Sequence, residues 1–421
     1  MLELKYIREN LDTVRENCAN RGLSVDLDSL LSLDERRRAL IAEQQGLREQ
    51  RNQLAQAMKG RKPSDAERAS GRQLKQREGP LADELRDTEA ALGELQRQVP
   101  NRTHADVPVG RDEDDNREIR RFGEPTQFDF VPADHLELGE RLDLLDFESG
   151  ARVTGQKWYY LKNEAVLLEH ALTRYALEFL RARDFTLFQT PDLARSEIAD
   201  GLGFNPRGAE SNVYSVPEHD LVLVGTAEIT LGGLHADQIL DEDALPLRYC
   251  GFSHCFRVEA GAAGRASRGL YRVHQFSKVE MFVYAHPDRS EEIHEELVGY
   301  EEEIFRSLEL PFRTVDVCTG DLGAPAFRKY DLEAWMPGRG EGGSWGEVTS
   351  TSNCTDYQAR RLGVRFRDSA TGRTRHVHLL NGTAISMCRA LLAIMENHQR
   401  ADGSIAIPKV LQPYTGFERI G

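Results

Sequence analysis

The segments Cys255–Glu259 (CFRVE) and Leu270–Glu280 (LYRVHQFSKVE) flank a glycine- and alanine-rich loop that carries Arg265 and Arg268. Both segments mix β-branched and aromatic residues with polar or charged ones, a composition typical of β-strands. Glycine in the intervening loop favours a turn. This stretch therefore predicts two neighbouring strands joined by a loop, and the rest of the fold is interpreted from it.

The charged and aromatic side chains of these strands are spaced two apart. They are Arg257 and Glu259 in the first segment, and Phe276, Lys278 and Glu280 in the second. Residues two apart in a strand point to the same face of a sheet. An arginine on that face can clamp an anionic oxygen with two N–H groups, and an aromatic ring can stack on a base. The alternative is a salt-bridged hairpin on a sheet surface.

From about residue 130 onward, strand-like and helix-like patterns are mixed. Strand-like runs are Leu221–Val224, Leu247–Arg257, Lys278–Tyr284 and Phe312–Val317. Helical periodicity covers Glu164–Arg183, Arg289–Leu308 and Ala384–His398. Strands joined by turns, with helices set apart, predict an α+β domain built on an antiparallel sheet flanked by helices.

Two further clusters contain residue types that bind polar ligands. Thr226 and Glu228 are expected on a strand or tight turn, where they point the same way and the carboxylate can hold an ammonium group. In Gly346–Asn353, Glu347 is followed by a run of hydroxyl residues, a combination that suits Mg²⁺ and phosphate. The same hydroxyl run is also compatible with an edge strand.

Leu380–Ala384 is expected to open the last helix, which carries Arg389. A helix N-terminus favours anions, and an arginine on the same helix can support a nucleotide. The alternative is a plain helix cap with a surface arginine. The glycine-rich stretch Gly338–Gly343 lacks the lysine and the following helix of a phosphate-binding P-loop, so we interpret it as a turn.

The N-terminal region has a different periodicity. Apolar positions with heptad-like spacing are Leu33, Leu40, Leu47 and Leu54, and then Leu81, Leu85, Thr88, Leu92, Leu95 and Val99. Between these runs lie Gly60, Pro63, and Ser64 with Glu67 three residues later, which break one helix and cap the next. The pattern predicts two long antiparallel helices that pack as a coiled coil.

The far end of this hairpin is basic. Residues 48–77 contain nine basic and three acidic residues, 9 − 3 = +6, whereas the whole chain of 421 residues has a formal net charge of −15. Such a patch favours a phosphate backbone. A solvated dimerisation coil or a spacer is the alternative interpretation of the hairpin.

The remaining composition excludes several classes of protein. The six cysteines form no Cys-x-x-Cys pair, so neither a zinc site nor a disulfide framework is expected. No apolar run approaches the roughly 20 residues of a membrane span. Met1–Lys5 has no apolar signal core, and a cytoplasmic location is expected.

Taken together, these motifs resemble the seryl branch of the class II aminoacyl-tRNA synthetases over essentially the whole chain. Phe256–Glu259 with Val273–Phe276 resembles motif 2 of class II, Asn381–Thr383 with Arg389 resembles motif 3, and the helix from Glu164 ending in Gln189–Pro191 resembles motif 1. The strings typical of the seryl enzymes are Thr226–Glu228, Arg272–Phe276 and Thr351–Thr355. An antiparallel coiled-coil arm is also typical of that branch.

The resemblance implies an ATP- and Mg²⁺-dependent ligase that forms seryl-adenylate and transfers serine to tRNA(Ser), with tRNA(Sec) as a further expected acceptor. It implies an N-terminal tRNA-binding domain over residues 1–99, a linker over 100–125, a class II catalytic domain over 126–421, and a homodimer formed through the motif 1 region. Arg257, Glu259 and Arg389 would carry catalysis.

The resemblance also assigns the substrate contacts. Serine would be bound by Thr226, Ala227, Glu228, Arg257, Glu280, Asn381 and Thr383. ATP would be bound by Arg257, Val258, Glu259, Arg272, Val273, Phe276, Glu347, Val348, Thr349, Ser350 and Arg389, with Phe276 and Arg389 on either side of the adenine and Glu347 and Ser350 holding Mg²⁺. The tRNA contacts would be Arg48, Arg51, Arg61, Lys62, Arg68, Arg72, Lys75 and Arg77.

Departures from the family pattern are small. Thr349 and Thr383 stand where serine is common, and each keeps the hydroxyl. Glu341–Trp345 lengthens a loop, and the sequence gives it no function. The alternatives are a paralogue that aminoacylates a carrier protein, which would lack the arm, and a non-catalytic paralogue, which would lack the charged pocket residues.

Overall fold

The computed structural model describes residues 1–204, 212–259 and 269–421, so Arg265 and Arg268 lie outside the described residues. The chain divides into two compact units, Met1–Arg102 and Thr103–Gly421. Among the described residues, no helix is both long enough and apolar enough to cross a membrane.

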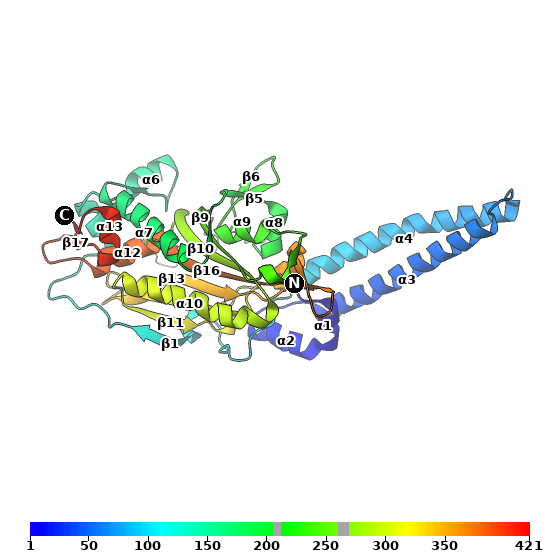
Figure 1. Ribbon diagram of the computed structural model, residues 1–421, viewed down its shortest axis with the longest axis horizontal. Coiled ribbons are helices and arrows are strands. Elements are labelled where there is room, and N and C mark those ends of the chain that lie inside the picture. Colours follow the sequence, from blue (N-terminus) through cyan, green and yellow to red (C-terminus); the bar gives the residue numbers. More distant parts are fainter. Residues whose placement is uncertain (205–211, 260–268) are drawn as a thin grey trace. The chain divides into compact units, whose positions relative to one another are not determined.

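The first unit is helical. It contains α1 (Leu4–Glu9), α2 (Leu11–Asn20) and the two long helices α3 (Leu27–Ala57) and α4 (Asp65–Gln98), which pack as an antiparallel hairpin (Figure 1). Leu40, Leu47 and Leu81 are buried between these two helices. Ser64 and Glu67 form the capping box at the start of α4 that the sequence predicts. The predicted coiled-coil hairpin is therefore confirmed.

The second unit is built on an eight-stranded sheet with the order β1-β11-β12-β13-β16-β10-β9-β4 (Figure 1). The strands are β1 (Arg117–Phe122), β4 (Thr186–Gln189), β9 (Leu247–Phe256), β10 (Gln275–Ala285), β11 (Phe312–Asp316), β12 (Arg328–Met336), β13 (Ser344–Asn353) and β16 (His378–Ser386). Neighbouring strands are antiparallel except β4, which runs parallel to β9. The α+β prediction is thus confirmed.

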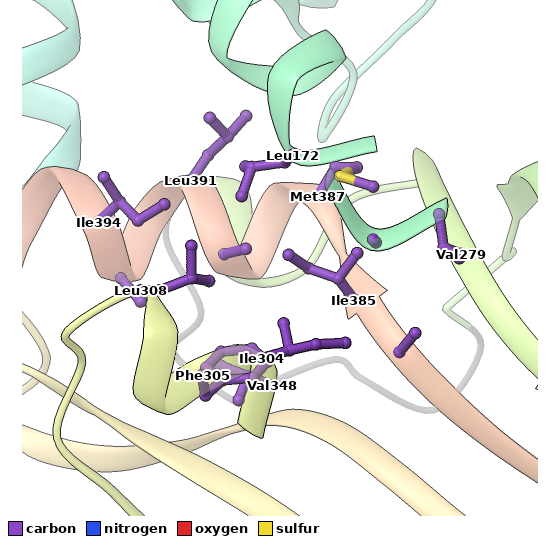
Figure 2. Packing of buried hydrophobic residues seen from close by; sticks show 14 of the residues in the cluster. Leu172, Val279, Ile304, Phe305, Leu308, Val348, Ile385, Met387, Leu391 and Ile394 are labelled. Atoms are coloured by element: carbon purple, nitrogen blue, oxygen red, sulfur yellow. The ribbon is translucent and has the colours of Figure 1, made fainter. Parts of the chain in front are cut away.

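The two faces of β10 have different surroundings. Odd-numbered residues, among them Val279 and Met281, belong to the main core with α7 (Glu164–Arg181), α10 (Ser290–Ser307) and α12 (Met387–Asn397). Figure 2 shows side chains of these three helices packed together with residues of β10, β13 and β16. Of the even-numbered residues, Phe282 and Tyr284 pack in a second core with α8 (Ser196–Leu202), α9 (Ala227–Gly233) and α11 (Tyr357–Leu362).

Three sequence predictions about local structure are wrong. Asn381, Gly382 and Thr383 lie inside β16 and not at a helix N-terminus, since α12 begins only at Met387. β16 is an interior strand that is almost wholly buried on both faces, so its apolar residues run on without the alternation that identifies a strand. Residues 100–125 are not a linker throughout, because Arg117–Phe122 forms the edge strand β1.

The third error concerns Thr226 and Glu228. They lie at the start of α9, where the Thr226 hydroxyl caps the helix by accepting the backbone N–H of Glu228 at 3.2 Å. By contrast, the hydroxyl run Thr349–Ser352 lies in β13, between β12 and β16, so the edge-strand alternative is excluded.

A buried carboxyl group joins α10 to β13. The side chain of Glu301 is 1% exposed and accepts hydrogen bonds from the hydroxyls of Thr349, at 2.7 Å, and Thr351. The Glu301 carboxyl also lies against Gly382 of β16. A Cβ atom added to Gly382 would lie 3.1 Å from Oε1 of Glu301. Burial raises the pKa of Glu301 well above its ordinary value, which favours the protonated form of this group in the folded chain.

We expect the variant Glu301→Gln to become more stable relative to the wild type as the pH rises. Above the ordinary pKa of a glutamate, the unfolded chain releases this proton more readily than the folded chain does, so wild-type stability falls with increasing pH. The amide has no such proton to retain. The difference in unfolding free energy should grow with pH, by at most about 1.4 kcal/mol per pH unit for one proton, measured by urea denaturation at pH 5.5, 7 and 8.

The matched control is Glu291→Gln, which alters an exposed glutamate at the start of the same helix. The difference in unfolding free energy between Glu291→Gln and the wild type should not depend on pH over this range. A pH-independent difference for Glu301→Gln would mean that Glu301 is ionised in the folded chain.

Candidate active site

A cavity of about 460 Å³ lies against the central strands of the sheet, and most of the pocket residues predicted from the sequence line it. It is lined by Thr226, Glu228, Arg257, Glu259, Arg272, Val273, Phe276, Lys278, Glu280, Glu347, Val348, Thr349, Ser350, Asn381, Thr383 and Arg389. Segments far apart in the chain meet here because β9, β10, β13 and β16 lie in one sheet. Ala227 and Val258 do not line the cavity.

Several lining residues were not proposed as ligands from the sequence. They include Asn212, Tyr271, Lys278 and Lys329. Lys278 could have been found, since it shares the spacing of Phe276 and Glu280 on β10. Lys329 could not, because nothing in the sequence places β12 beside β13.

One end of the cavity is built around Glu280. Its Oε2 pairs with the Lys278 ammonium at 2.5 Å and accepts the Thr383 hydroxyl at 3.2 Å. Glu280 and Thr383 lie opposite each other in the β10–β16 register, which explains this contact. Within the described residues Oε1 of Glu280 accepts no hydrogen bond, so the cavity offers an acceptor next to a hydroxyl group.

Glu228 lies close to this end and is 8% exposed. Burial, and secondly the charge of Glu280, raise the pKa of Glu228 to about 7, while Gln358, Lys278 and Arg257 act to lower it. Its Oε1 accepts a hydrogen bond from the Gln358 amide at 2.7 Å. Near neutral pH this carboxyl is therefore close to half ionised, and an incoming cation would favour its charged form.

The other end of the cavity is cationic. Arg389 on α12 donates to the backbone oxygen of Glu347 at 2.9 Å and pairs with its carboxylate at 3.2 Å. The Arg389 guanidinium lies 4.9 Å from the centre of the Tyr271 ring. Burial acts to raise the pKa of Glu347, but the charges of Arg389, Lys329 and Arg257 outweigh it, and the pKa is lowered.

Arg257 differs from the other cations of the cavity. Arg272, Lys278, Lys329 and Arg389 each have a carboxylate partner. Arg257 has no ion pair with any residue in the described part of the chain; its Nε donates weakly to the Gly225 backbone oxygen at 3.4 Å, and its guanidinium lies 5.2 Å from the Phe276 ring centre. Its charge is therefore available to an anionic ligand.

The backbone just after β9 holds Glu259 in an unusual conformation. Glu259 has φ = 54°, in the left-handed region that a non-glycine residue adopts at a cost of about 1–3 kcal/mol. The Asn212 side chain stabilises it by accepting the Glu259 N–H at 2.6 Å, and the carboxylate pairs with Arg272, also at 2.6 Å. The strained residue presents its carboxylate to the cavity beside Arg257.

Comparison with known families matches both units. Residues 1–103 match the seryl-tRNA synthetase N-terminal domain, and residues 213–398 match the class II tRNA synthetase core domain for G, H, P, S and T. The chain is 55% identical over 425 residues to the serine–tRNA ligase of Treponema denticola, with both chains fully covered. It is 56% identical over 427 residues to that of Rubrobacter xylanophilus, covering 100% of this chain and 99% of the relative.

Solved structures give the same result. The seryl-tRNA synthetase of Pyrococcus horikoshii complexed with ATP has a TM-score of 0.92 at 42% identity, covering 100% of this chain and 99% of the other. The cytoplasmic serine–tRNA ligase of Naegleria fowleri in complex with AMP has a TM-score of 0.86 at 31% identity, covering 99% and 96%. A prolyl-tRNA synthetase from Giardia lamblia, at 15% identity and a TM-score of 0.57, shares the fold over 66% of this chain and 54% of its own.

Proposed function

This chain belongs to the seryl-tRNA synthetase family and is a serine–tRNA ligase. We propose that its cavity binds serine at one end and ATP at the other. The observation that carries the proposal is the position of Arg257. Its unpaired guanidinium shares one cavity with the acidic end formed by Glu228, Glu280 and Thr383 and with the cationic end formed by Arg389 and Lys329.

Serine occupies the acidic end in this proposal. Its ammonium group binds Glu228 and the Thr226 hydroxyl, and its own hydroxyl donates to the free Oε1 of Glu280 beside Thr383 and Asn381. Ala227, which is fully buried, acts through its place between Thr226 and Glu228. A site built around a substrate hydroxyl disfavours alanine, which leaves the acceptor unpaired.

ATP occupies the cationic end. The adenine lies between Phe276 and Arg389, with Glu259 at its amino edge, and Arg272, Val273 and Val258 line or support that part of the cavity. Arg257 contacts both the α-phosphate and the serine carboxylate, so the two reacting groups meet at one guanidinium. Glu347, Val348, Thr349 and Ser350 face the phosphates from β13.

The reaction needs no protein nucleophile. A serine carboxylate oxygen attacks the α-phosphorus of ATP, the bond to pyrophosphate breaks, and seryl-adenylate forms. A hydroxyl of the 3′-terminal ribose of tRNA then attacks the seryl carbonyl, and AMP leaves. Arg257, Glu259 and Arg389 contribute by positioning the reactants and by balancing the charge that develops on the phosphate.

We propose Mg²⁺ as the cation, held by Glu347 and Ser350. Hard oxygen donors suit this ion. The surroundings fit, because Asp331 beside Ser350 is buried and its Oδ1 has no hydrogen-bond partner within the described parts of the chain. When bound, the ion would offset the negative charge of the ATP phosphates.

The hairpin of α3 and α4 is proposed to bind tRNA(Ser). Four of the predicted contacts are already in ion pairs: Arg51 with Glu78, Arg61 with Glu67, Arg68 with Asp65, and Arg77 with Glu43. The other four have no ion pair among the described residues and are exposed: Arg48, Lys62, Arg72 and Lys75. These four are the better candidates for phosphate contacts.

Other assignments rest on the family. We propose a homodimer that forms through the region of α7 and β4, where Leu167 and Leu187 are 51% and 37% exposed. Charging of tRNA(Sec) and a cytoplasmic location stay predictions from the sequence. The carrier-protein and non-catalytic alternatives are not favoured, since the arm domain is matched and the charged residues of the pocket are all present.

The direct test of the proposed substrate is ATP–pyrophosphate exchange without tRNA, measured with each standard amino acid and Mg²⁺. We expect exchange with serine and at most traces with alanine or threonine. Efficient exchange with another amino acid would contradict the roles of Glu280 and Thr383.

Arg257→Ala should reduce serine-dependent exchange by roughly 10²–10³-fold or more, because it removes a guanidinium that has no ion pair among the described residues and that we place at the reacting groups. Arg373→Ala, which alters an exposed arginine outside the cavity, is the control and should be normal. Near-normal exchange in Arg257→Ala would refute the role of this residue.

Replacing Arg48, Lys62, Arg72 and Lys75 together by glutamine should raise KM for tRNA and lower its dependence on salt, while serine activation without tRNA is unchanged. The matched control replaces Arg51, Arg61, Arg68 and Arg77 by glutamine. It also removes four positive charges, but from side chains that are already paired with carboxylates. The rise in KM for tRNA should therefore be smaller. Normal charging by a chain lacking Glu43–Arg77, with the helix ends bridged above the Leu40–Leu81 contact, would contradict the role of the arm.

A further inference from the structure

Gln358 on α11 lies behind the serine end of the cavity and does not line it. Its side chain is almost completely buried, at 1% exposed. The amide nitrogen donates to Oε1 of Glu228 at 2.7 Å and to the backbone oxygen of Leu202 at 3.0 Å. Its own oxygen, Oε1, is buried and accepts no hydrogen bond from any residue that the structure describes.

The orientation of this amide is fixed by its two acceptors. Rotating the amide by 180° would place its oxygen against the Leu202 carbonyl and the Glu228 carboxylate, both of which are acceptors. Leu202 is the last residue of α8, so its carbonyl has no partner within the helix and needs a donor. The Gln358 amide therefore directs an N–H group to Glu228, and its oxygen is left without a donor among the described residues.

A donor in this place favours the charged form of Glu228. The carboxyl is surrounded by Glu280 and Lys278 from β10 and by Arg257 at the end of β9. The pKa of Glu228 is raised to about 7 by burial and Glu280, and the hydrogen bond from Gln358 keeps it from rising further. The hydrogen bond from Gln358 uses Oε1 of Glu228, and among the described residues Oε2 accepts no hydrogen bond.

We propose that Gln358 is a positioning residue for serine: it holds one oxygen of Glu228 and favours the ionised carboxylate, so that the other oxygen receives the ammonium group of the substrate. The inference rests on the proposed role of Glu228 in the serine site. Gln358 touches neither substrate, and it acts only through this carboxylate.

The test is Gln358→Met, which keeps the length of the side chain and removes the donor. Exchange kinetics are measured for serine and for ATP from pH 5.5 to 9. We expect KM for serine to rise about tenfold at pH 7, while KM for ATP changes less than twofold. The acidic limb of kcat/KM for serine should move to higher pH by about one unit, because Glu228 has lost a donor to its charged form.

Gln358→Glu supplies a second variant in case the first does not fold. It places another carboxyl beside Glu228, so the acidic limb should move to higher pH here as well. Loss of kcat with an unchanged KM for serine and an unchanged acidic limb would overturn the inference and leave Gln358 a merely structural residue.

Glu228→Gln separates this inference from the proposed function. If Glu228→Gln loses serine affinity while both Gln358 variants retain it and keep the wild-type pH profile, only the role of Gln358 fails. If Glu228→Gln binds serine normally, the proposed serine site itself is wrong, and the Gln358 inference falls with it.

Discussion

Carboxylates inside a β-sheet cost free energy unless each one is paired with a cation or keeps its proton. This constraint shapes the centre of the second unit. Glu280 is paired with Lys278 and Glu347 with Arg389, while burial of Glu301 on α10 raises the pKa of that carboxyl and favours its protonated form. Among the described residues Glu228 has no ion pair, and its pKa of about 7 leaves it partly ionised at neutral pH. The ammonium group of serine would supply the missing cation, so substrate binding would complete a charge arrangement that the fold leaves open.

The sheet makes this arrangement possible by fixing the register of four strands. Glu280 meets Thr383 because β10 and β16 are antiparallel neighbours, and Thr351 lies opposite Gly382 because β13 is the next strand. Gly382 has no side chain, which leaves room for the Glu301 carboxyl on the far face while Asn381 and Thr383 face the cavity. Both faces of the same short segment are thus occupied by polar groups, and a shift of one residue in register would exchange them.

Sequence reasoning succeeded where a pattern is local and failed where it depends on packing. The hairpin of α3 and α4 was predictable because heptad spacing and the Ser64–Glu67 cap are properties of neighbouring residues. Phe276, Lys278 and Glu280 were predictable because one strand places them on one face. Strand β16 was mistaken for the start of a helix, since burial on both faces removes the alternation. Strand β1 (REIRRF) was hidden by its charges, which an exposed edge strand tolerates. Gln358 gave no signal, because its role exists only once α8, α9 and α11 lie together.

The two acidic groups of the serine end share one design. Glu280 uses Oε2 for both Lys278 and Thr383, and Glu228 uses Oε1 for Gln358. In each carboxylate, one oxygen is fixed by hydrogen bonds or an ion pair, and the other has no such contact among the described residues. An unanchored carboxylate would have to lose rotational freedom when the ligand arrives, at a cost to affinity. Here that freedom is already restricted in the folded chain, so the hydroxyl and the ammonium group of serine would meet acceptors whose orientation is set in advance. Selectivity for serine would then depend as much on the anchoring residues Lys278, Thr383 and Gln358 as on the two carboxylates proposed to contact the substrate.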